Sequence, residues 1–217
     1  MKRLFVVAAL AAVALVPVAA HADSVTVGES LQISGGFDVN GNGSVFKVQE
    51  SEGNIFDSFC VEGNETIGSP ATVQGISGSA YNGGFTGGTP DPLDQRSAWL
   101  YRNYRAGTNG ITDAQRVQHA IWYLEGELRQ SIGGIPTALN IDCTGNVTCA
   151  AYLAAANLGA TAVDLNYVRV MNFGPLPQTT LGPRQDLLTL VPEPASMLLL
   201  GLGLVGAAGA ARRRSSK

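Results

Sequence analysis

Hydrophobic and polar residues alternate along the first part of the chain in the manner of β-strands. The alternation runs over residues 24–34 and 45–48, and an apolar segment at 55–61 predicts a third strand. Between the first two segments, residues 40–43 are Asn-Gly-Asn-Gly, and both residue types tolerate the positive φ of a tight turn. We therefore predict strands joined by a hairpin in this region.

A helical period begins after Pro92. Residues 93–105 are predicted to form a helix that is closed by Gly107. A second helix is predicted to begin at Thr112, because Thr112 and Gln115 have the spacing of a capping box. Its buried stripe is expected to consist of apolar residues three or four positions apart, namely Ala114, Val117, Ile121, Leu124 and Leu128.

The rest of the body returns from helix to strand. An alanine-rich helix is predicted over 149–158, and strand patterns follow at 166–173 and 186–191. The Gly-, Ser- and Thr-rich segment 63–89 is expected to be a loop with short strand pieces. Strands on both sides of a helical stretch predict an α+β protein, a β-sandwich or barrel that carries an inserted helical subdomain.

The first 22 residues have the three parts of a secretory signal peptide. Two basic residues precede an apolar run over 4–20, and Ala20 and Ala22 provide the small side chains that signal peptidase requires. Cleavage is therefore predicted between Ala22 and Asp23, with an uncleaved anchor as the alternative. The body would then face the oxidising side of the membrane.

The last part of the chain combines a short motif, an apolar run and a basic cluster. At 1.5 Å per residue, the 17-residue run 195–211 spans about 25 Å, at the short end for a transmembrane helix. The basic cluster would stay in the cytoplasm by the positive-inside rule. The motif and the cluster are Pro192, Glu193 and Pro194, and Arg212, Arg213 and Arg214.

This order of elements resembles the PEP-CTERM sorting signal of Gram-negative bacteria. The resemblance covers residues 191–217 and implies an exosortase as a processing enzyme beside signal peptidase. It also implies an inner-membrane intermediate that later reaches the cell surface or the extracellular space. A simple tail anchor with a chance Pro-Glu-Pro is the alternative. The remaining domain, 23–190, is the predicted ectodomain.

The charge of the body restricts its partners. Six of the 14 basic residues lie in the terminal segments, which leaves eight in the body against 16 of the 17 acidic residues. A domain with this acidic excess cannot neutralise phosphates, so nucleic-acid binding is excluded. The apolar segments lie only at the two ends, which also excludes a polytopic membrane protein.

Three cysteines in an exported chain leave one without a partner. Cys143 and Cys149 are six residues apart around a turn-forming Gly-Asn pair, and we predict a disulfide between them. Cys60 remains, on a predicted strand. Such a cysteine is a buried apolar residue, an intermolecular bridge or a reactive group.

Two short segments resemble the thioester domains of bacterial surface proteins. They are Phe59-Cys60-Val61-Glu62 and the run 117–122, Val-Gln-His-Ala-Ile-Trp. The resemblance implies that Cys60 and Gln118 condense into an internal thioester with loss of ammonia. Phe59 and Trp122 would shield it until an amine or hydroxyl of a surface or polysaccharide partner attacks. Val117 departs from the family, where a threonine often precedes the glutamine.

Other functions have weaker support in the sequence. A structural matrix protein with the same fold would keep Cys60 as a core residue and Gln118 as a cap for a local polar group. A hydrolase that uses Cys60 with His119 lacks a recognisable orienting residue. His119, the only histidine of the body, is expected to be exposed on its helix. Residues 38–44 resemble the start of a calcium loop, but a hairpin turn is favoured. We predict a non-enzymatic protein without metal or cofactor.

Overall fold

A computed structural model describes most of the body of this chain. The described residues are 22–37, 43–63, 67–81, 88, 90–127, 129–132, 135–138, 143, 149–173, 185–192, 201 and 203. The helices are α2 (Gln95–Ala106), α3 (Ala114–Leu124), α4 (Ala150–Gly159) and the 3-10 helix η2 (Asp164–Asn166). The strands are β1 (Ser30–Phe37), β2 (Gly43–Gln49), β3 (Ile55–Ser58), β4 (Ala71–Thr72), β5 (Gly75–Ser77), β6 (Ser79–Ala80), β7 (Asp91–Pro92), β8 (Arg129–Ile132), β9 (Ile135–Ala138), β10 (Val168–Asn172) and β11 (Leu187–Leu190). The predicted mixture of sheets and helices is confirmed.

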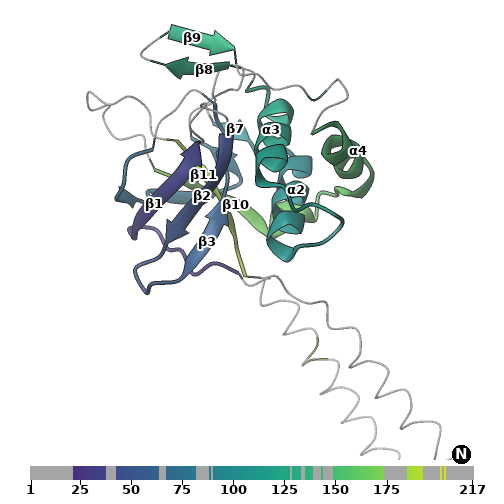
Figure 1. The fold of residues 1–217 in the computed structure, drawn as a ribbon. Coiled ribbons are helices and arrows are strands. Elements are labelled where there is room, and N and C mark those ends of the chain that lie inside the picture. The colour runs from purple at the N-terminus through teal and green to yellow at the C-terminus, as the bar shows by residue number, and fades with distance from the viewer. Residues whose placement is uncertain are drawn as a thin grey trace, which may run out of the picture.

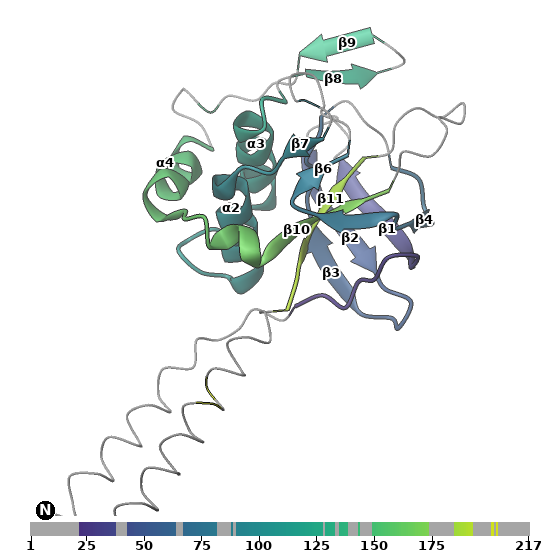
Figure 2. The ribbon, with the colours of Figure 1, turned by 180° about the vertical axis from the view of Figure 1, so that it is seen from behind.

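Two larger antiparallel sheets form most of the β part of the body, beside the two-stranded pairs β6–β7 and β8–β9. One has the order β3-β2-β1-β4 and the other the order β11-β10-β5. Two extended segments join them. The first, 55–61, forms β3 and then pairs with β11 at Cys60. The second, 71–77, forms β4 beside β1 and then β5 beside β10. The strands therefore follow one another in a closed hydrogen-bonded order (Figures 1 and 2).

The helices lie together on one side of the strands (Figure 1). They occur in the sequence between β7 and β10, so they interrupt the run of core strands. Helix α3 contacts strand β2 on one side and helices α2 and α4 on the other. Because neighbours cover it on opposite sides, α3 has a much wider buried surface than one apolar stripe provides.

The core consists of two apolar clusters. The helix cluster contains Phe59, Val117 and Ile121 together with residues of α2 and α4. The sheet cluster contains Cys60 and Trp122 together with residues of β1, β2 and β11. Successive side chains of a strand point to opposite faces. Phe59 and Cys60 therefore belong to different clusters although they are adjacent in sequence.

Both long helices begin at aspartates rather than at the predicted positions. Helix α2 starts after Asp94, whose side chain accepts a hydrogen bond from Arg96 N at 2.7 Å. Its predicted end is confirmed, because Gly107 caps it with φ of 62°. The predicted capping box is wrong: Asp113, not Thr112, is the N-cap of α3. A carboxylate accepts the helix N–H group strongly and also complements the helix dipole.

The end of α3 and the start of β1 also differ from the prediction. Helix α3 ends at Leu124, and Gly126 follows in a positive-φ conformation of 80° that stops the helical period. Leu128 lies outside the described residues. Strand β1 begins at Ser30 instead of residue 24, and Val27 is 62% exposed. Strands β2, β10 and β11 are confirmed, and segment 63–89 contains short strands as predicted. The β8–β9 hairpin was not predicted.

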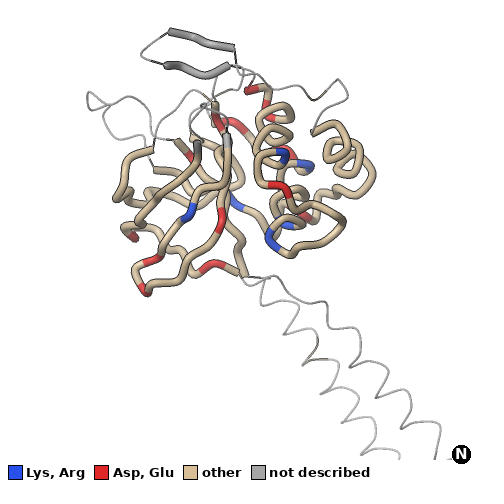
Figure 3. The backbone as a smooth tube through the Cα atoms, in the orientation of Figure 1, with Lys and Arg blue, Asp and Glu red and all other residues tan. Residues whose placement is uncertain are grey.

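Five basic side chains of the described body are each paired with a carboxylate. Figure 3 shows Lys and Arg in blue and Asp and Glu in red along the backbone of the body. The ion pairs are Lys47–Asp57, Arg96–Asp94, Arg102–Asp164, Arg105–Asp23 and Arg116–Asp113. These cations are therefore already engaged by carboxylates.

Most of the two terminal segments lies outside the described residues. These are residues 1–21 of the predicted signal peptide and the predicted membrane segment 195–211 apart from Gly201 and Gly203. The predicted turn at 40–43 also lies outside the described residues, except for Gly43. Within the described part of the chain, no helix has the length and apolar character needed to cross a bilayer.

Candidate functional site

Cys60 lies where the chain crosses from one sheet to the other. It forms an antiparallel bridge with Leu187. Its two neighbours make the flanking hydrogen bonds: Val61 N donates to Asp186 O at 3.2 Å, and Leu188 N donates to Phe59 O at 3.1 Å. In a pair of this kind, the central residue turns its own N–H and C=O away from the partner strand. Both groups of Cys60 therefore face away from β11.

The side chain of Gln118 on α3 satisfies both of these backbone groups. Cys60 N donates to Gln118 Oε1 at 2.9 Å, and Gln118 Nε2 donates to Cys60 O at 3.0 Å. Both residues are completely buried. The carboxamide thus pairs with Cys60 in the way that a residue of a neighbouring strand would. Gln118 is adjacent to Val117 of the predicted stripe, and it is fully buried because α3 contacts both β2 and the helices α2 and α4.

The structure brings the two predicted thioester residues together across 58 positions of sequence. The carboxamide carbon of Gln118 lies one covalent bond behind both Oε1 and Nε2. The carboxamide carbon therefore faces the backbone of Cys60. The arrangement also matches the structural alternative, in which Gln118 caps a local polar group.

The two predicted shielding residues lie on different faces. Trp122 belongs to the sheet cluster with Cys60, and its indole Nε1 donates to Glu62 O at 3.3 Å. Phe59 belongs to the helix cluster. Its ring packs edge-on against Tyr101 and Tyr104, with ring centroids 6.1 and 5.0 Å apart. Trp122 thus lies in the same cluster as the Cys60 side chain, and Phe59 lies on the opposite face of their strand.

Three buried carboxylates lie next to this pair and were not singled out from the sequence. Glu62, Glu127 and Asp186 are each about 1% exposed. Each accepts a backbone N–H group from a different part of the chain. The donors are Asp186 N to Glu62 at 3.3 Å, Gly63 N to Glu127 at 3.0 Å, and Tyr81 N and Phe173 N to Asp186 at 2.8 and 3.0 Å. The carboxylates therefore hold several chain segments together beside Cys60.

Burial changes the protonation of one of these groups. It raises the pKa of Asp186 to about 7, and the hydrogen bonds from Tyr81 N and Phe173 N lower that pKa only in part. Burial thus favours the protonated form of Asp186. Gln185 beside it donates through Nε2 to Glu62 O, which adds a polar contact to the same cluster.

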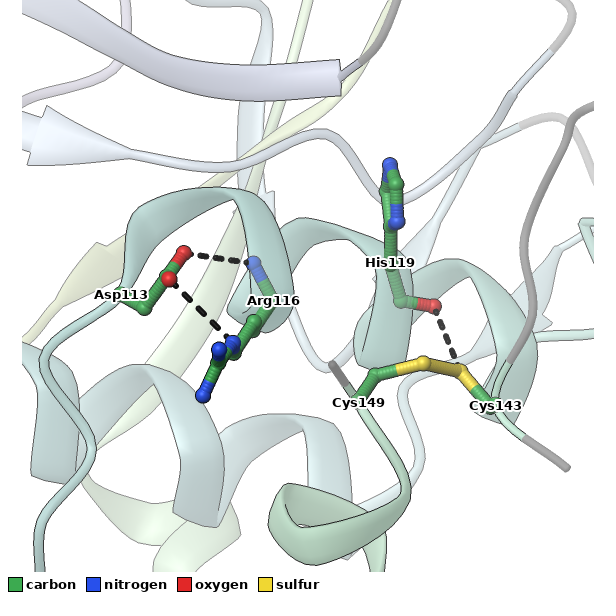
Figure 4. Close-up of a disulfide and its surroundings, with 5 residues drawn as sticks. All are labelled: Asp113, Arg116, His119, Cys143 and Cys149. Atoms are coloured by element: carbon green, nitrogen blue, oxygen red, sulfur yellow. Dashed lines mark hydrogen bonds and ion pairs between the residues drawn. A yellow bond between two sulfur atoms is a disulfide. The ribbon is translucent and has the colours of Figure 1, made fainter. Parts of the chain in front are cut away.

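His119 is buried, contrary to the expectation that it is exposed. Only 8% of its surface is accessible, and its ring stacks on Trp122 with a centroid distance of 6.2 Å. Figure 4 shows the ring pointing away from Cys143 and Cys149, which lie against the backbone of His119. The Sγ atom of Cys143 lies 3.7 Å from His119 O. Cys143 therefore lies against this turn of α3.

Cys143 and Cys149 lie at disulfide distance, with their Cα atoms 4.9 Å apart, as predicted. Cys149 is the residue directly before α4, and both side chains belong to the helix cluster. The link therefore fastens the start of α4 to the surface of α3 (Figure 4).

The predicted first residue of the mature chain is integrated into the body. Asp23 Oδ1 pairs with Arg105 at 2.8 Å, and Asp23 Oδ2 accepts from Thr189 Oγ1 and Leu190 N at 3.0 and 2.8 Å. Asp23 N donates to Leu190 O at 2.9 Å, whereas Ala22 is partly exposed. The start of the ectodomain is therefore bonded to its last strand.

The sorting motif begins directly behind this junction. Pro192 follows β11 by one residue, Val191, whose N–H donates to Tyr167 O at 2.8 Å. The other predicted motif residues, Glu193, Pro194, Arg212, Arg213 and Arg214, lie outside the described residues. Within the described residues, no group of three His, Cys, Asp or Glu side chains is arranged to hold a metal ion.

Comparison with known proteins identifies the C-terminal signal. The family model of the PEP-CTERM protein-sorting motif matches residues 190–214. No curated protein and no solved structure matches the chain. The matched segment starts at the last residue of β11, so the signal follows the folded body without a spacer. The chain is thus an exported protein that is processed by an exosortase at the membrane.

Proposed function

We propose that this exported protein is a covalent-capture or adhesion module of the cell surface or extracellular matrix. Residues 23–190 would form one thioester-domain-like unit, a barrel of strands with an inserted helical part. The reactive bond would join Cys60 Sγ to the carboxamide carbon of Gln118. The observation that carries this proposal is the pair of hydrogen bonds that holds the Gln118 amide against Cys60 in a fully buried place.

The chemistry needs only groups that are present. The thiolate of Cys60 attacks the carboxamide carbon, and Cys60 N–H already donates to Gln118 Oε1, where negative charge develops. The C–S bond forms as the C–N bond breaks. Nε2 leaves as ammonia, having taken the proton that the thiol gives up. The fixed N–H group thus serves as a preorganised donor for the tetrahedral intermediate.

Burial would keep the product from hydrolysis until a partner arrives. Trp122 is completely buried in the same cluster as Cys60, which limits access of water from that side. An amine or hydroxyl of the partner would then take the acyl group and leave a covalent link. Such a reaction consumes the bond once, so the protein acts as a capture device and not as an enzyme.

Intact mass tests the proposal. The processed protein purified from the cell envelope should weigh about 17 Da less than its sequence with the disulfide counted, the mass of one ammonia. Methylamine should abolish the deficit and add its own mass. Cys60→Ala should show neither effect. A methylamine adduct on a residue other than Gln118, located by peptide mapping, would contradict the assignment.

The second candidate function is a matrix protein without a reactive bond. It is favoured by the same two hydrogen bonds, because they satisfy buried backbone groups of Cys60 without any reaction. A processed protein of full mass that ignores methylamine would support this alternative.

A further inference from the structure

We infer that the folded body protects its own signal-peptidase site, so that the signal peptide is removed before Asp23 docks on β11. This inference rests on the predicted cleavage between Ala22 and Asp23 and is independent of the proposed thioester. The decisive atom is Asp23 N, the nitrogen of the bond to be cut. In the folded body it is bonded to the last strand before the sorting motif.

Leu190 of β11 offers Asp23 two backbone groups. Leu190 stands opposite Val168 of β10, and the next residue, Val191, donates its N–H to Tyr167 O at 2.8 Å. In a pair of this kind, the central residue directs its own N–H and C=O away from the partner strand. Asp23 meets both groups: its N donates to Leu190 O at 2.9 Å, and its Oδ2 accepts from Leu190 N at 2.8 Å.

Further contacts fix the chain on the carboxyl side of the predicted cut. Arg105 of α2 pairs with Asp23 Oδ1 at 2.8 Å. Ser24 donates through N and Oγ to the carboxylate of Glu50 at 2.8 and 2.7 Å. Asp23 is only 9% exposed, whereas Ala22 is partly exposed. The chain is therefore bonded to the body from the scissile nitrogen onward, and it is open only on the side of Ala22.

Cleavage requires that this bond leaves the body. Hydrolysis adds water to the carbonyl carbon of Ala22 and breaks its bond to Asp23 N, which leaves a carboxylate on Ala22 and an ammonium group on Asp23. A peptidase must reach both sides of the bond, so Asp23 would first have to separate from β11 and from Arg105. Proteolysis of a folded protein follows the population of such an open form. Cleavage before docking meets no such barrier.

Removal of the signal peptide leaves the docking contacts intact. The new ammonium group of Asp23 still has an N–H for Leu190 O, and a charged donor makes a stronger hydrogen bond than a neutral one. The carboxylates of Asp23 and Glu50 balance the charges of this ammonium group and of Arg105. The processed chain can therefore close the same junction that would block its own processing in the precursor.

The time at which signal peptidase is added tests the inference. The full-length precursor is made by cell-free synthesis in detergent under oxidising conditions. Purified signal peptidase is present during synthesis in one arm and is added after folding in the other. We expect cleavage after Ala22 in the first arm and a largely uncut precursor in the second, measured by intact mass after equal times. Equal cut fractions in the two arms would overturn the inference.

Two variants locate the protection at Asp23. Insertion of Gly-Ser-Gly-Ser between Ala22 and Asp23 moves the scissile bond out of the body and leaves the sequence of the body unchanged. The folded insertion variant should be cut at least about tenfold faster than the folded wild type, equivalent to about 1.4 kcal/mol. Arg105→Met should also be cut faster, whereas Arg116→Met at an exposed ion pair should be cut like wild type. An insertion variant that resists the peptidase as well as wild type does would show that docking of Asp23 is not the source of protection, and it would overturn the inference.

Discussion

Replacing Gln118 with methionine tests whether its amide is a structural partner of Cys60. The change is made in a Cys60→Ala background, so that no thioester can form while the backbone at position 60 stays the same. Methionine has nearly the length and flexibility of glutamine, which keeps the packing of this buried position. The variant removes both hydrogen bonds, from Cys60 N at 2.9 Å and to Cys60 O at 3.0 Å.

The magnitude follows from the two backbone groups that lose their partner. Each buried donor or acceptor left unpaired costs about 1–3 kcal/mol, so a loss of about 2–6 kcal/mol in the free energy of unfolding is expected. Gln115→Met is the matched control, because Gln115 lies on the same helix and is exposed. That change should alter the free energy by less than about 0.5 kcal/mol.

Urea denaturation followed by circular dichroism measures both variants against the Cys60→Ala parent. The midpoint should fall for Gln118→Met while the slope stays constant, since the same surface is exposed on unfolding. If Gln118→Met and Gln115→Met lose similar amounts, the paired hydrogen bonds do not stabilise the fold, and the geometric basis of the site is wrong.

Three further predictions concern other parts of the molecule. Arg105→Met should cost about 3–5 kcal/mol in unfolding free energy, because it leaves the buried carboxylate of Asp23 unpaired, whereas Arg116→Met at an exposed pair should cost less than about 1 kcal/mol. Burial raises the pKa of Glu125 to about 7 from 4.5, so its contribution to stability is full below about pH 4.5 and is lost as the pH rises through 7. Glu125→Gln should therefore unfold at higher urea than wild type at pH 8 and show a smaller difference at pH 5. Deleting Arg212–Arg214 should impair retention or orientation at the membrane, measured by fractionation and by alkaline phosphatase fused after residue 190.

Each of these has a clear contrary result. Equal losses for the two arginine variants would show that the Asp23 pair does not stabilise the body. An unchanged pH profile in Glu125→Gln would remove Glu125 as a source of the pH dependence. Normal sorting without the arginine cluster would defeat its assignment as a cytoplasmic anchor.

The hydrophobic period predicted which helices and strands occur in the body better than the residues at which they begin and end. Alternation located β2, β10 and β11, and the 3.6-residue period located α2 and α3. The cap of α3 was misplaced because Thr112 and Asp113 are adjacent and both are good N-cap residues. Only the backbone geometry decides between them. A sandwich or barrel was expected, but which strands are neighbours could not be predicted, because that depends on hydrogen bonds between segments far apart in sequence.

The polar side of the site was harder to predict than its apolar side. Acidic residues normally lie in solvent, so Glu62, Glu127 and Asp186 gave no signal in the sequence. Their partners are backbone N–H groups of distant segments, which no side-chain pattern records. The burial of His119 was missed for a related reason, since one apolar stripe describes a helix covered on one side and α3 contacts both β2 and the helices α2 and α4.

Structural and reactive roles of Gln118 are compatible, because one contact serves both. Gln118 pairs with both backbone groups of Cys60 in the folded body, which places its amide beside the residue whose thiol would attack it. Condensation would release Nε2 as ammonia and so remove the hydrogen bond to Cys60 O, whereas the bond from Cys60 N to the acyl oxygen can stay. The proposed thioester state would therefore be held together less well than the folded precursor, so the contact that permits the reaction is also weakened by it.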